Sequence, residues 1–361
     1  MVDLHLLTGE RINPLWVPHW ESREPMDYRD DRDAPSYGPL GTGKLLSAIA
    51  GNSLCLEPFG MPPDEEVRAG ATLHGEAGVS LWSAECFGGE DRGGVRFGVS
   101  VPNSGLDFAR IVWLREGESA VRVRETVSNQ RDADRQIQWQ QHVTLAPPFV
   151  TRDDCRLLVP GANGMTLPSG YEGHELLAKD AEFEWPFAPG AASGTVDLRI
   201  PFQQQGKGFV AGVQLNPDRE YAFVCAVNRP RHLVFGCVFR RRDFPWVTLW
   251  EENHARPGPP WSGVAEASAI EFGVSPLPIG RAETLRRGER FGIPVMANLP
   301  ARGSIHAGYL MFIAHVPNEA ERIADLACRD DELRLLDASG GAIAEVSVRG
   351  ARNFLEGKDQ G

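Results

Sequence analysis

Short runs of alternating hydrophobic and polar residues recur along most of the chain, separated by glycine and proline. Residue types such as Val, Phe, Trp, Ile and Leu dominate these runs, which cover 94–101, 108–114, 120–127, 220–227, 232–240, 246–251, 267–275 and 308–315. Two-residue alternation places successive side chains on opposite faces of a strand, and turn residues at this spacing are typical of antiparallel sandwiches and barrels. Helical periodicity is weak and indicates short helices only at 43–50 and 319–326. The pattern predicts an all-β protein of antiparallel sheets with few short helices.

The first 43 residues have a different pattern, in which tryptophan and tyrosine alternate with proline. Residues 1–43 are therefore expected to form an N-terminal arm that packs on the domain through its aromatic side chains. The acid-rich run at 27–33 contains arginines and lacks an EF-hand spacing, so it predicts a solvated loop in preference to a Ca²⁺ site. Because no repeat or linker divides the remainder, we expect a single domain over 44–353 and a polar tail over 354–361.

Composition excludes several classes of partner. The 361 residues are 42% hydrophobic, enough for a large core, and carry a formal net charge of −12 from 37 basic and 49 acidic residues. This charge argues against non-specific binding to nucleic acid or anionic membranes. No run approaches the roughly 20 apolar residues that span a bilayer, and the first residues do not form a signal peptide. We expect no nucleic-acid or membrane partner.

The cysteines indicate the cellular compartment, and the absence of several motifs argues against some classes of enzyme. Six cysteines are scattered without a Cys-x-x-Cys pair, and no Asn-x-Ser/Thr acceptor occurs. This usage favours free thiols in a reducing compartment, and hence a cytoplasmic protein. The chain also lacks a Gly-x-Ser-x-Gly elbow, a phosphate-binding glycine loop and a dinucleotide fingerprint, so no organic cofactor is expected.

The segment 136–145 carries an unusual polar face. At a strand's period of two, one face holds amides, a hydroxyl and an imidazole, contributed by Gln136, Gln138, Gln140, His142 and Thr144. These neutral groups both donate and accept hydrogen bonds, and the histidine titrates near neutral pH. Such a face suits a neutral polyhydroxylated ligand, so Gln138 and Gln140 are candidate substrate contacts.

Two further strands add candidate groups. Glu271 shares a strand face with small residues, and apolar residues pack behind it, a setting that raises a carboxyl pKa and admits a ligand. An edge-strand surface glutamate is the alternative. The run 246–254 places Trp246 and Trp250 beside polar groups, which suits the C–H face of a sugar ring. Core packing is the alternative, and for the tryptophans taken by themselves it is the stronger interpretation.

A loop at 72–78 contains His74-Gly-Glu-Ala-Gly, in which the glycines let backbone approach closely. Asn52 lies upstream as a possible amide donor. The order of Asn52, this loop, Ser128-Asn129, the Gln140-Gln141-His142 strand and Glu271 resembles the aldose 1-epimerase (galactose mutarotase-like) family. The resemblance implies a β-supersandwich over roughly 40–350. Two departures are a His-Gly-Glu where His-Gly-Gly is usual and Ser53 where an arginine follows the asparagine.

Carried over position by position, the resemblance implies Glu271 as the general base, His142 as the acid and His74 as the residue that orients the ring oxygen. The reaction is interconversion of aldose anomers by ring opening, without a metal or organic cofactor. Asn52, Glu76, Gln138, Gln140, Trp246 and Trp250 are the candidate substrate contacts. The expected partner is a monosaccharide or small oligosaccharide, and the protein is expected to be a monomer or a homodimer.

Two alternatives remain at this stage. A carbohydrate-binding or sensing module on the same sandwich, without turnover, uses the glutamines and tryptophans equally well. A metal site is the other, because His74 and Glu76, two positions apart, could join His142 as a two-histidine, one-carboxylate set. Convergence of both histidines and Glu271 on one cavity large enough for a hexose, with the carboxylate and one of the two imidazoles on opposite sides of it, is the arrangement expected for an epimerase.

Overall fold

Two large antiparallel sheets form the body of the protein. The computed structural model describes residues 1–6, 11–316 and 320–358. The first sheet has seven strands in the order β1 (Asn52–Leu56), β7 (Trp139–Leu145), β17 (Glu266–Gly273), β16 (Trp246–Asn253), β13 (Lys207–Leu215), β9 (Gly161–Thr166) and β10 (Glu182–Glu184). The second has eight, in the order β2 (Ser83–Gly88), β3 (Arg92–Val101), β4 (Leu106–Arg115), β5 (Ala120–Asn129), β21 (Ser304–His315), β15 (Leu233–Arg240), β14 (Tyr221–Asn228) and β8 (Cys155–Leu158). All the strand runs predicted from alternation are strands in the structure.

Smaller elements decorate this body. Three two-stranded sheets pair β11 (Phe187–Pro189) with β12 (Thr195–Asp197), β18 (Glu289–Arg290) with β19 (Ile293–Pro294), and β20 (Ala297–Leu299) with β6 (Arg135–Ile137). A C-terminal sheet contains β22 (Asp325–Cys328), β23 (Glu332–Leu336) and β24 (Ala342–Ser347). The helices are short: α1 (Asp30–Tyr37), α2 (Leu40–Leu46), α3 (Asp64–Arg68), α4 (Arg281–Arg287) and α5 (Ala351–Leu355), with 3₁₀ turns η1 (Pro25–Asp27), η2 (Glu76–Val79) and η3 (Ala320–Arg322). None of the helices in the described residues is long and apolar enough to cross a membrane.

The main core lies between the two large sheets. Phe272 of β17 stacks on Phe239 of β15 with ring centroids 4.3 Å apart and meets Tyr309 of β21 edge-on at 5.2 Å. Burial of such aromatic side chains is the main favourable term in holding the sheets together. Since side chains alternate along each strand, the other face of β7, β16 and β17 points away from this core. Gln140, His142 and Thr144 of β7 lie on that outer face.

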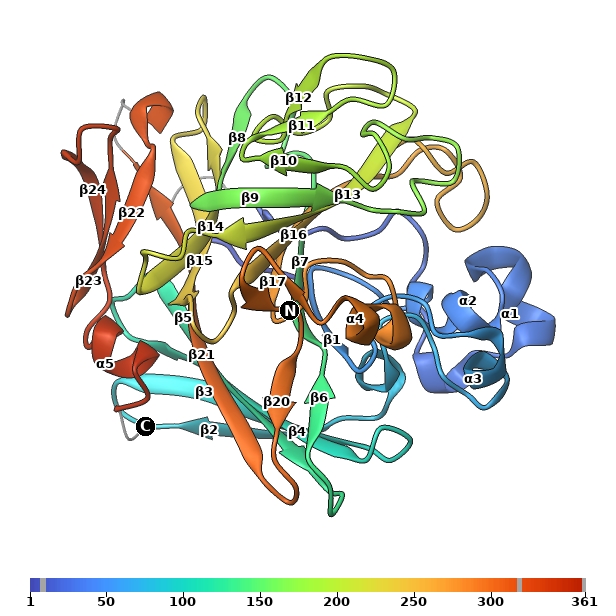
Figure 1. Cartoon of the computed structure of the whole chain (residues 1–361). Coiled ribbons are helices and arrows are strands. Elements are labelled where there is room, and N and C mark those ends of the chain that lie inside the picture. The colour runs from blue at the N-terminus through green and yellow to red at the C-terminus, as the bar shows by residue number, and fades with distance from the viewer. Residues whose placement is uncertain (7–10, 317–319, 359–361) are drawn as a thin grey trace.

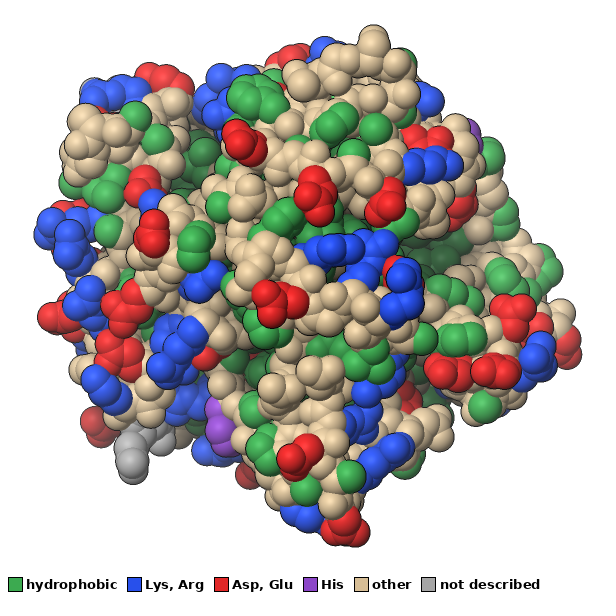
Figure 2. Space-filling model, viewed as in Figure 1, with side chains coloured by type: hydrophobic (Ala, Val, Ile, Leu, Met, Phe, Trp, Pro, Cys, Tyr) green, Lys and Arg blue, Asp and Glu red, His purple; other side chains and the backbone are tan. Residues whose placement is uncertain are grey.

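The two outer faces are covered by opposite ends of the chain (Figure 1). The C-terminal sheet and α5 pack on the eight-stranded sheet around a cluster that includes Phe312 and Phe354. The N-terminal segment packs on the seven-stranded sheet, where Trp16 and Leu46 join Trp246 and Trp250. Figure 1 shows α1, α2 and α3 on one side of the molecule and β22–β24 on the opposite side. Basic and acidic side chains are interspersed over the face seen in Figure 2.

Several local predictions differ from the structure. The helix expected at 43–50 is α2, which begins three residues earlier. The helix expected at 319–326 is wrong: position 319 lies outside the described residues, η3 is a single turn, and β22 follows because it completes the C-terminal sheet. The acid-rich run enters α1, where Asp33 accepts the backbone N–H of Arg29 at 2.8 Å near the helix N-terminus. At the other end, α5 buries Phe354 and Leu355 where a polar tail was expected, because both complete the outer core.

Candidate active site

Adjacent strands place Glu271 and His142 side by side. In the antiparallel register Phe272 of β17 faces Gln141 of β7, so Glu271, which precedes Phe272, and His142, which follows Gln141, lie opposite each other on the outer face. The carboxylate Oε1 of Glu271 is 3.4 Å from Nε2 of His142. Only 3% and 4% of the two residues is exposed. The edge-strand alternative for Glu271 is therefore wrong, because β17 lies between β7 and β16 and the carboxyl is buried.

A strained loop brings His74 to the same place. Its backbone has φ of +60°, and the following Gly75 has φ of +88°. A Cβ at Gly75 would lie 2.1 Å from the backbone oxygen of Leu56, so only glycine fits there. The carbonyl of Gly60 accepts the His74 backbone N–H at 3.1 Å. As a result, the His74 ring lies with its centroid 5.5 Å from that of His142.

Hydrogen bonds constrain the two imidazoles. Nδ1 of His74 accepts the backbone N–H of Gly60 at 3.3 Å, so the ring proton of neutral His74 is on Nε2. Nδ1 of His142 lies 2.9 Å from the hydroxyl of Thr144. Oε2 of Glu271 has no hydrogen-bond partner within the described structure. An unpartnered buried carboxyl oxygen is costly to the fold and is more often found where a ligand supplies the missing donor.

Burial shifts the titration of all three groups. It raises the pKa of the Glu271 carboxyl well above its usual value and lowers the pKa of His142 to about 4. It also lowers the pKa of His74, an effect increased by the nearby His142. Burial disfavours whichever form is charged. Burial therefore favours the neutral carboxyl of Glu271 and the neutral imidazoles of His142 and His74.

All three groups line one cavity of about 300 Å³. This volume is at the lower end of the range for small-molecule sites. One wall is aromatic, with Trp250, Tyr171 and Trp261 among the lining residues. The indole N–H of Trp250 donates to the hydroxyl of Tyr171 at 2.8 Å, and that hydroxyl donates to Glu252 at 2.9 Å. The apolar remainder of the lining comes from Leu46, Ile49, Met61, Leu73, Leu167, Val210 and Pro278.

Arg256 is a cavity residue that the sequence interpretation missed. Its guanidinium lies over the rings of Tyr171 and Trp261, at 4.5 and 4.9 Å from their centroids. Nη1 is 3.7 Å from the carboxylate of Glu252, and Nε is 3.5 Å from the carboxylate of Glu172. One feature of the sequence could have indicated this residue: the Pro- and Gly-rich connection 254–265, which follows a strand with two tryptophans, contains both an arginine and a tryptophan. The contact of Arg256 with Tyr171 could not be predicted from a local pattern, because Tyr171 lies 85 residues earlier in the sequence.

Of the six predicted substrate contacts, Trp250 lines the cavity and the other five do not. Gln138 donates to the hydroxyl of Thr284 and Gln140 to that of Thr248, each at 3.1 Å. Trp246 donates its indole N–H to a backbone carbonyl at 2.9 Å. These three side chains are fully buried, and their donors are used within the protein. The structure places them as supports for the strands and not in the cavity.

Asn52 and Glu76 also lie elsewhere. Asn52 points to the core between the sheets, where it donates to the hydroxyl of Tyr309 at 3.2 Å. The carboxylate of Glu76 accepts the backbone N–H groups of Asn103 and Ser104 at 3.4 and 3.2 Å. The metal site that would join Glu76 to the two histidines is therefore not assembled. Within the described residues, no group of three or more His, Cys, Asp and Glu is arranged to hold a metal ion.

Comparison with known proteins locates the fold. No protein-family model and no curated protein matches the sequence. The structure is similar to a "putative aldose 1-epimerase" from Klebsiella pneumoniae, with a TM-score of 0.56 and 15% identity over 83% of this chain and 72% of that one. A galactose mutarotase-like protein from Lactobacillus casei matches with a TM-score of 0.45 and 12% identity over 73% and 85% of the two chains. The first similarity confirms the predicted fold class, an antiparallel galactose mutarotase-like β-supersandwich.

Proposed function

We propose that the protein is an aldose 1-epimerase-like enzyme that interconverts the anomers of a monosaccharide by ring opening. The observation that carries this proposal is the contact between Glu271 and His142 at the wall of a sugar-sized cavity that also contains His74. Trp250 and its aromatic neighbours supply a surface for the apolar face of a sugar ring. The shared fold supports the proposal, but the site residues support it independently.

Direct contact between base and acid fits the chemistry better than opposite placement. The anomeric hydroxyl O1 and the ring oxygen O5 are both bonded to C1, so the groups that serve them must be neighbours. Glu271 removes the O1 proton while His142 donates a proton to O5. The C1–O5 bond then breaks, and C1 becomes an aldehyde. Rotation about C1–C2 and reversal of both proton transfers close the ring with the other configuration.

The directions of the two pKa shifts fit the proposed proton transfers. Before ring opening the reactive form has a charged Glu271 and a protonated His142, which the hydroxyls of a bound sugar stabilise. After ring opening both groups are neutral, the form that burial favours. Burial thus stabilises the pair in the ring-opened state relative to the closed state. His74 donates from Nε2, since its Nδ1 is already used by Gly60.

Polarimetry tests the proposal. Fresh solutions of α-D-glucose, α-D-galactose and other crystalline anomers relax to equilibrium slowly in water, and the purified protein should accelerate at least one of them. The Glu271→Gln and His142→Ala variants should each lose that acceleration while keeping the fold. If saturation-transfer NMR detects a bound aldose but no aldose relaxes faster, the protein is instead the carbohydrate-binding module considered above. Unchanged catalysis in both variants contradicts the proposed roles.

A further inference from the structure

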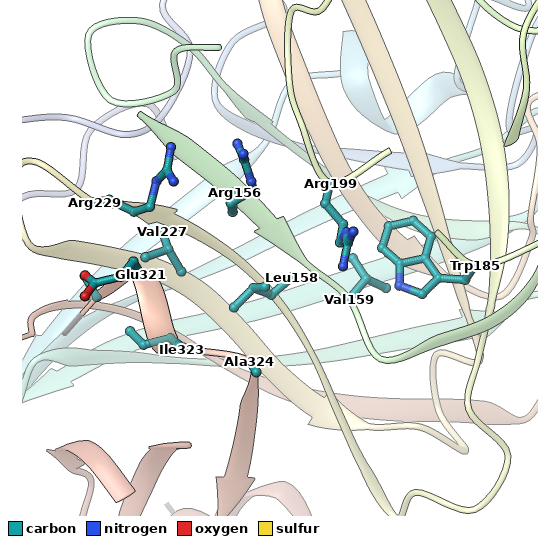
Figure 3. Close-up of a pocket in the computed structure, with 11 residues that line it drawn as sticks. Arg156, Leu158, Val159, Trp185, Arg199, Val227, Arg229, Glu321, Ile323 and Ala324 are labelled. Atoms are coloured by element: carbon teal, nitrogen blue, oxygen red, sulfur yellow. The ribbon is translucent and has the colours of Figure 1, made fainter. Parts of the chain in front are cut away.

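A second cavity of about 360 Å³ lies beside β8, an edge strand of the eight-stranded sheet. It is bounded by β8, β14 and the segment 320–324 that leads into the C-terminal sheet (Figure 3). None of its lining residues lines the candidate active site. Three arginines and a tryptophan line it, and Glu321 is the one described lining residue with a carboxylate. Its composition is therefore basic in a protein whose net charge is −12.

Strand pairing forces two of these arginines together. Arg156 on β8 faces Val227 on β14 in the antiparallel register, and Arg229 follows Val227 by two residues. Residues related in this way are diagonal neighbours on the same face of the sheet. Figure 3 shows the guanidinium groups of Arg156 and Arg229 side by side and pointing in the same direction. Like charges in this arrangement repel each other.

Neither of these two guanidinium groups is held by a direct ion pair among the described residues, although Arg156 is near enough to Asp197 to contribute to the lowered pKa of that carboxyl. Arg156 donates to the backbone carbonyl of Cys155 at 2.9 Å. Arg229 donates from Nε to the carbonyl of Asp154 at 3.1 Å, and from Nη2 to the carbonyl of Asp153. These carbonyls fix the position of the guanidinium groups but carry no net charge. In the part of the chain that the structure describes, neither Arg156 nor Arg229 forms an ion pair with a carboxylate.

The third arginine and the tryptophan continue the row. Arg199 is held by a bidentate pair with Asp197, with N–O distances of 2.9 and 2.7 Å, so its charge is balanced and its orientation fixed. Figure 3 shows Arg199 between Arg156 and Trp185. Trp185 is half-buried at the end of the row. A flat aromatic surface next to cationic groups suits a ring that carries an anionic substituent.

We propose that this cavity binds a phosphate monoester of a ring compound, with the phosphate on Arg156 and Arg229 and the ring against Trp185. A phosphate monoester carries about −1.5 to −2 charges at pH 7, which matches two guanidinium groups that form no ion pair with the protein's described residues. Guanidinium forks also fit phosphate oxygens bidentately. The ring belongs to a sugar or to a nucleoside. Because the site is separate from the catalytic cavity, the proposal goes beyond the proposed epimerase activity and does not depend on it.

Isothermal titration calorimetry on the full-length protein tests this site. The probes are inorganic phosphate, D-glucose 6-phosphate and AMP, with D-glucose and adenosine as uncharged counterparts. The test variant is Arg156→Gln with Arg229→Gln. The matched control is Arg286→Gln with Arg302→Gln, which removes the same charge from two exposed arginines paired with carboxylates elsewhere. Trp185→Leu tests the contribution of the ring surface.

We expect D-glucose 6-phosphate or AMP to bind more tightly than inorganic phosphate, and the better of the two identifies the ring as sugar or nucleoside. The Arg156/Arg229 variant should bind that probe at least about tenfold more weakly, while the control variant binds it like the wild type. Any anomer interconversion should be retained in both double variants. The proposal is overturned if no phosphorylated probe binds at millimolar concentration, or if the Arg156/Arg229 variant binds it unchanged. Equal affinity for inorganic phosphate and both ring compounds overturns the role of Trp185.

Discussion

Oε1 of Glu271 and Nε2 of His142 lie 3.4 Å apart on neighbouring central strands, with both side chains almost completely buried. The two groups consequently titrate as one pair, whose behaviour differs from that of either residue alone. Several measurable consequences depend on this contact and on the elements that support it.

Replacement of Glu271 by glutamine should lower kcat for anomer interconversion by about 10²–10⁴ and change KM little. The amide keeps the shape of the side chain but cannot accept the O1 proton. Initial rates by polarimetry measure both constants. Glu266→Gln, at the start of the same strand and more exposed, should behave like the wild type. A Glu271→Gln enzyme with normal kcat would exclude the carboxylate as the base.

The pH dependence of kcat/KM should be bell-shaped. The active pair carries one proton: below the His142 pKa of about 4 it carries two, and above the raised pKa of Glu271 it carries none. Activity therefore falls on the acidic side near pH 4 and on the alkaline side above the raised pKa of the carboxyl. Rates across this range, corrected for spontaneous mutarotation at each pH, test the assignment. A profile that falls at mildly acidic pH, near the ordinary histidine pKa of about 6.5, would contradict it.

Removal of the His74 imidazole should weaken catalysis if the backbone conformation of its loop is preserved. Asparagine tolerates a positive φ better than most residues, so His74→Asn should preserve the backbone and remove the Nε2 donor. We expect kcat/KM to fall about tenfold or more, since one hydrogen bond to the substrate is lost. His254, which also has a positive φ but does not line the cavity, provides the matched variant His254→Asn. If both variants lose activity equally, His74 has only a structural role.

The glycine after His74 should be irreplaceable for steric reasons. Gly75→Ala introduces a Cβ 2.1 Å from the backbone oxygen of Leu56. Gly70→Ala is the control, because Gly70 has a similar positive φ of +100° but open space around the added atom. Both variants bear the strain of a positive φ, and Gly75→Ala should be destabilised by about 1–3 kcal/mol more. Urea unfolding of the two variants measures this difference, and equal stabilities would show that the loop can move away from Leu56.

Glu251 of β16 lies on the face of the strand opposite the catalytic cavity, and its buried carboxyl should make the stability of the fold decrease as pH rises. Burial raises the pKa of Glu251 to about 8 from 4.5, helped by the neighbouring Glu252. Between these values the folded state keeps a proton that the unfolded state has lost. The Glu251 contribution is therefore complete below pH 4.5 and is lost as pH rises to about 8, by roughly 4–5 kcal/mol in total. In Glu251→Gln, unfolding free energies at pH 5 and pH 8 should differ less than in the wild type. An identical difference in both proteins would show that Glu251 is ionised when folded.

Alternation predicted the sheets well because the strands obey a strong local rule. Ile270 and Phe272 point into the core and Glu271 away from it, as their order in the sequence requires. The same rule placed His142 on the face opposite Trp139. It could not reveal that Gln138 and Gln140 would be consumed by hydroxyl groups of other elements, because their partners Thr284 and Thr248 are more than 100 residues away. A polar face in the sequence looks the same whether its partners are a ligand or the protein.

Elements at the chain ends were harder to predict. Leu326 and Cys328 form a strand because β23 is available to pair with it, and the local sequence also permits a helix. Arg256 and Tyr171 meet only through the fold, and neither belongs to a regular hydrophobic pattern. The contact between Glu271 and His142 depends on the register between two strands, which the pattern within either strand does not contain.

The floor and the walls of the catalytic cavity come from different kinds of structure. Glu271, His142 and Trp250 stand on interior strands, whereas much of the remaining lining comes from residues between 46 and 74 and from the connections around 167–172 and 254–262. Adaptation to a new sugar can therefore proceed by exchange of connecting segments, and the reactive pair is inherited intact. In evolutionary terms the scaffold separates what reaction is performed from what molecule undergoes it, so substrate preference can diverge faster than chemistry.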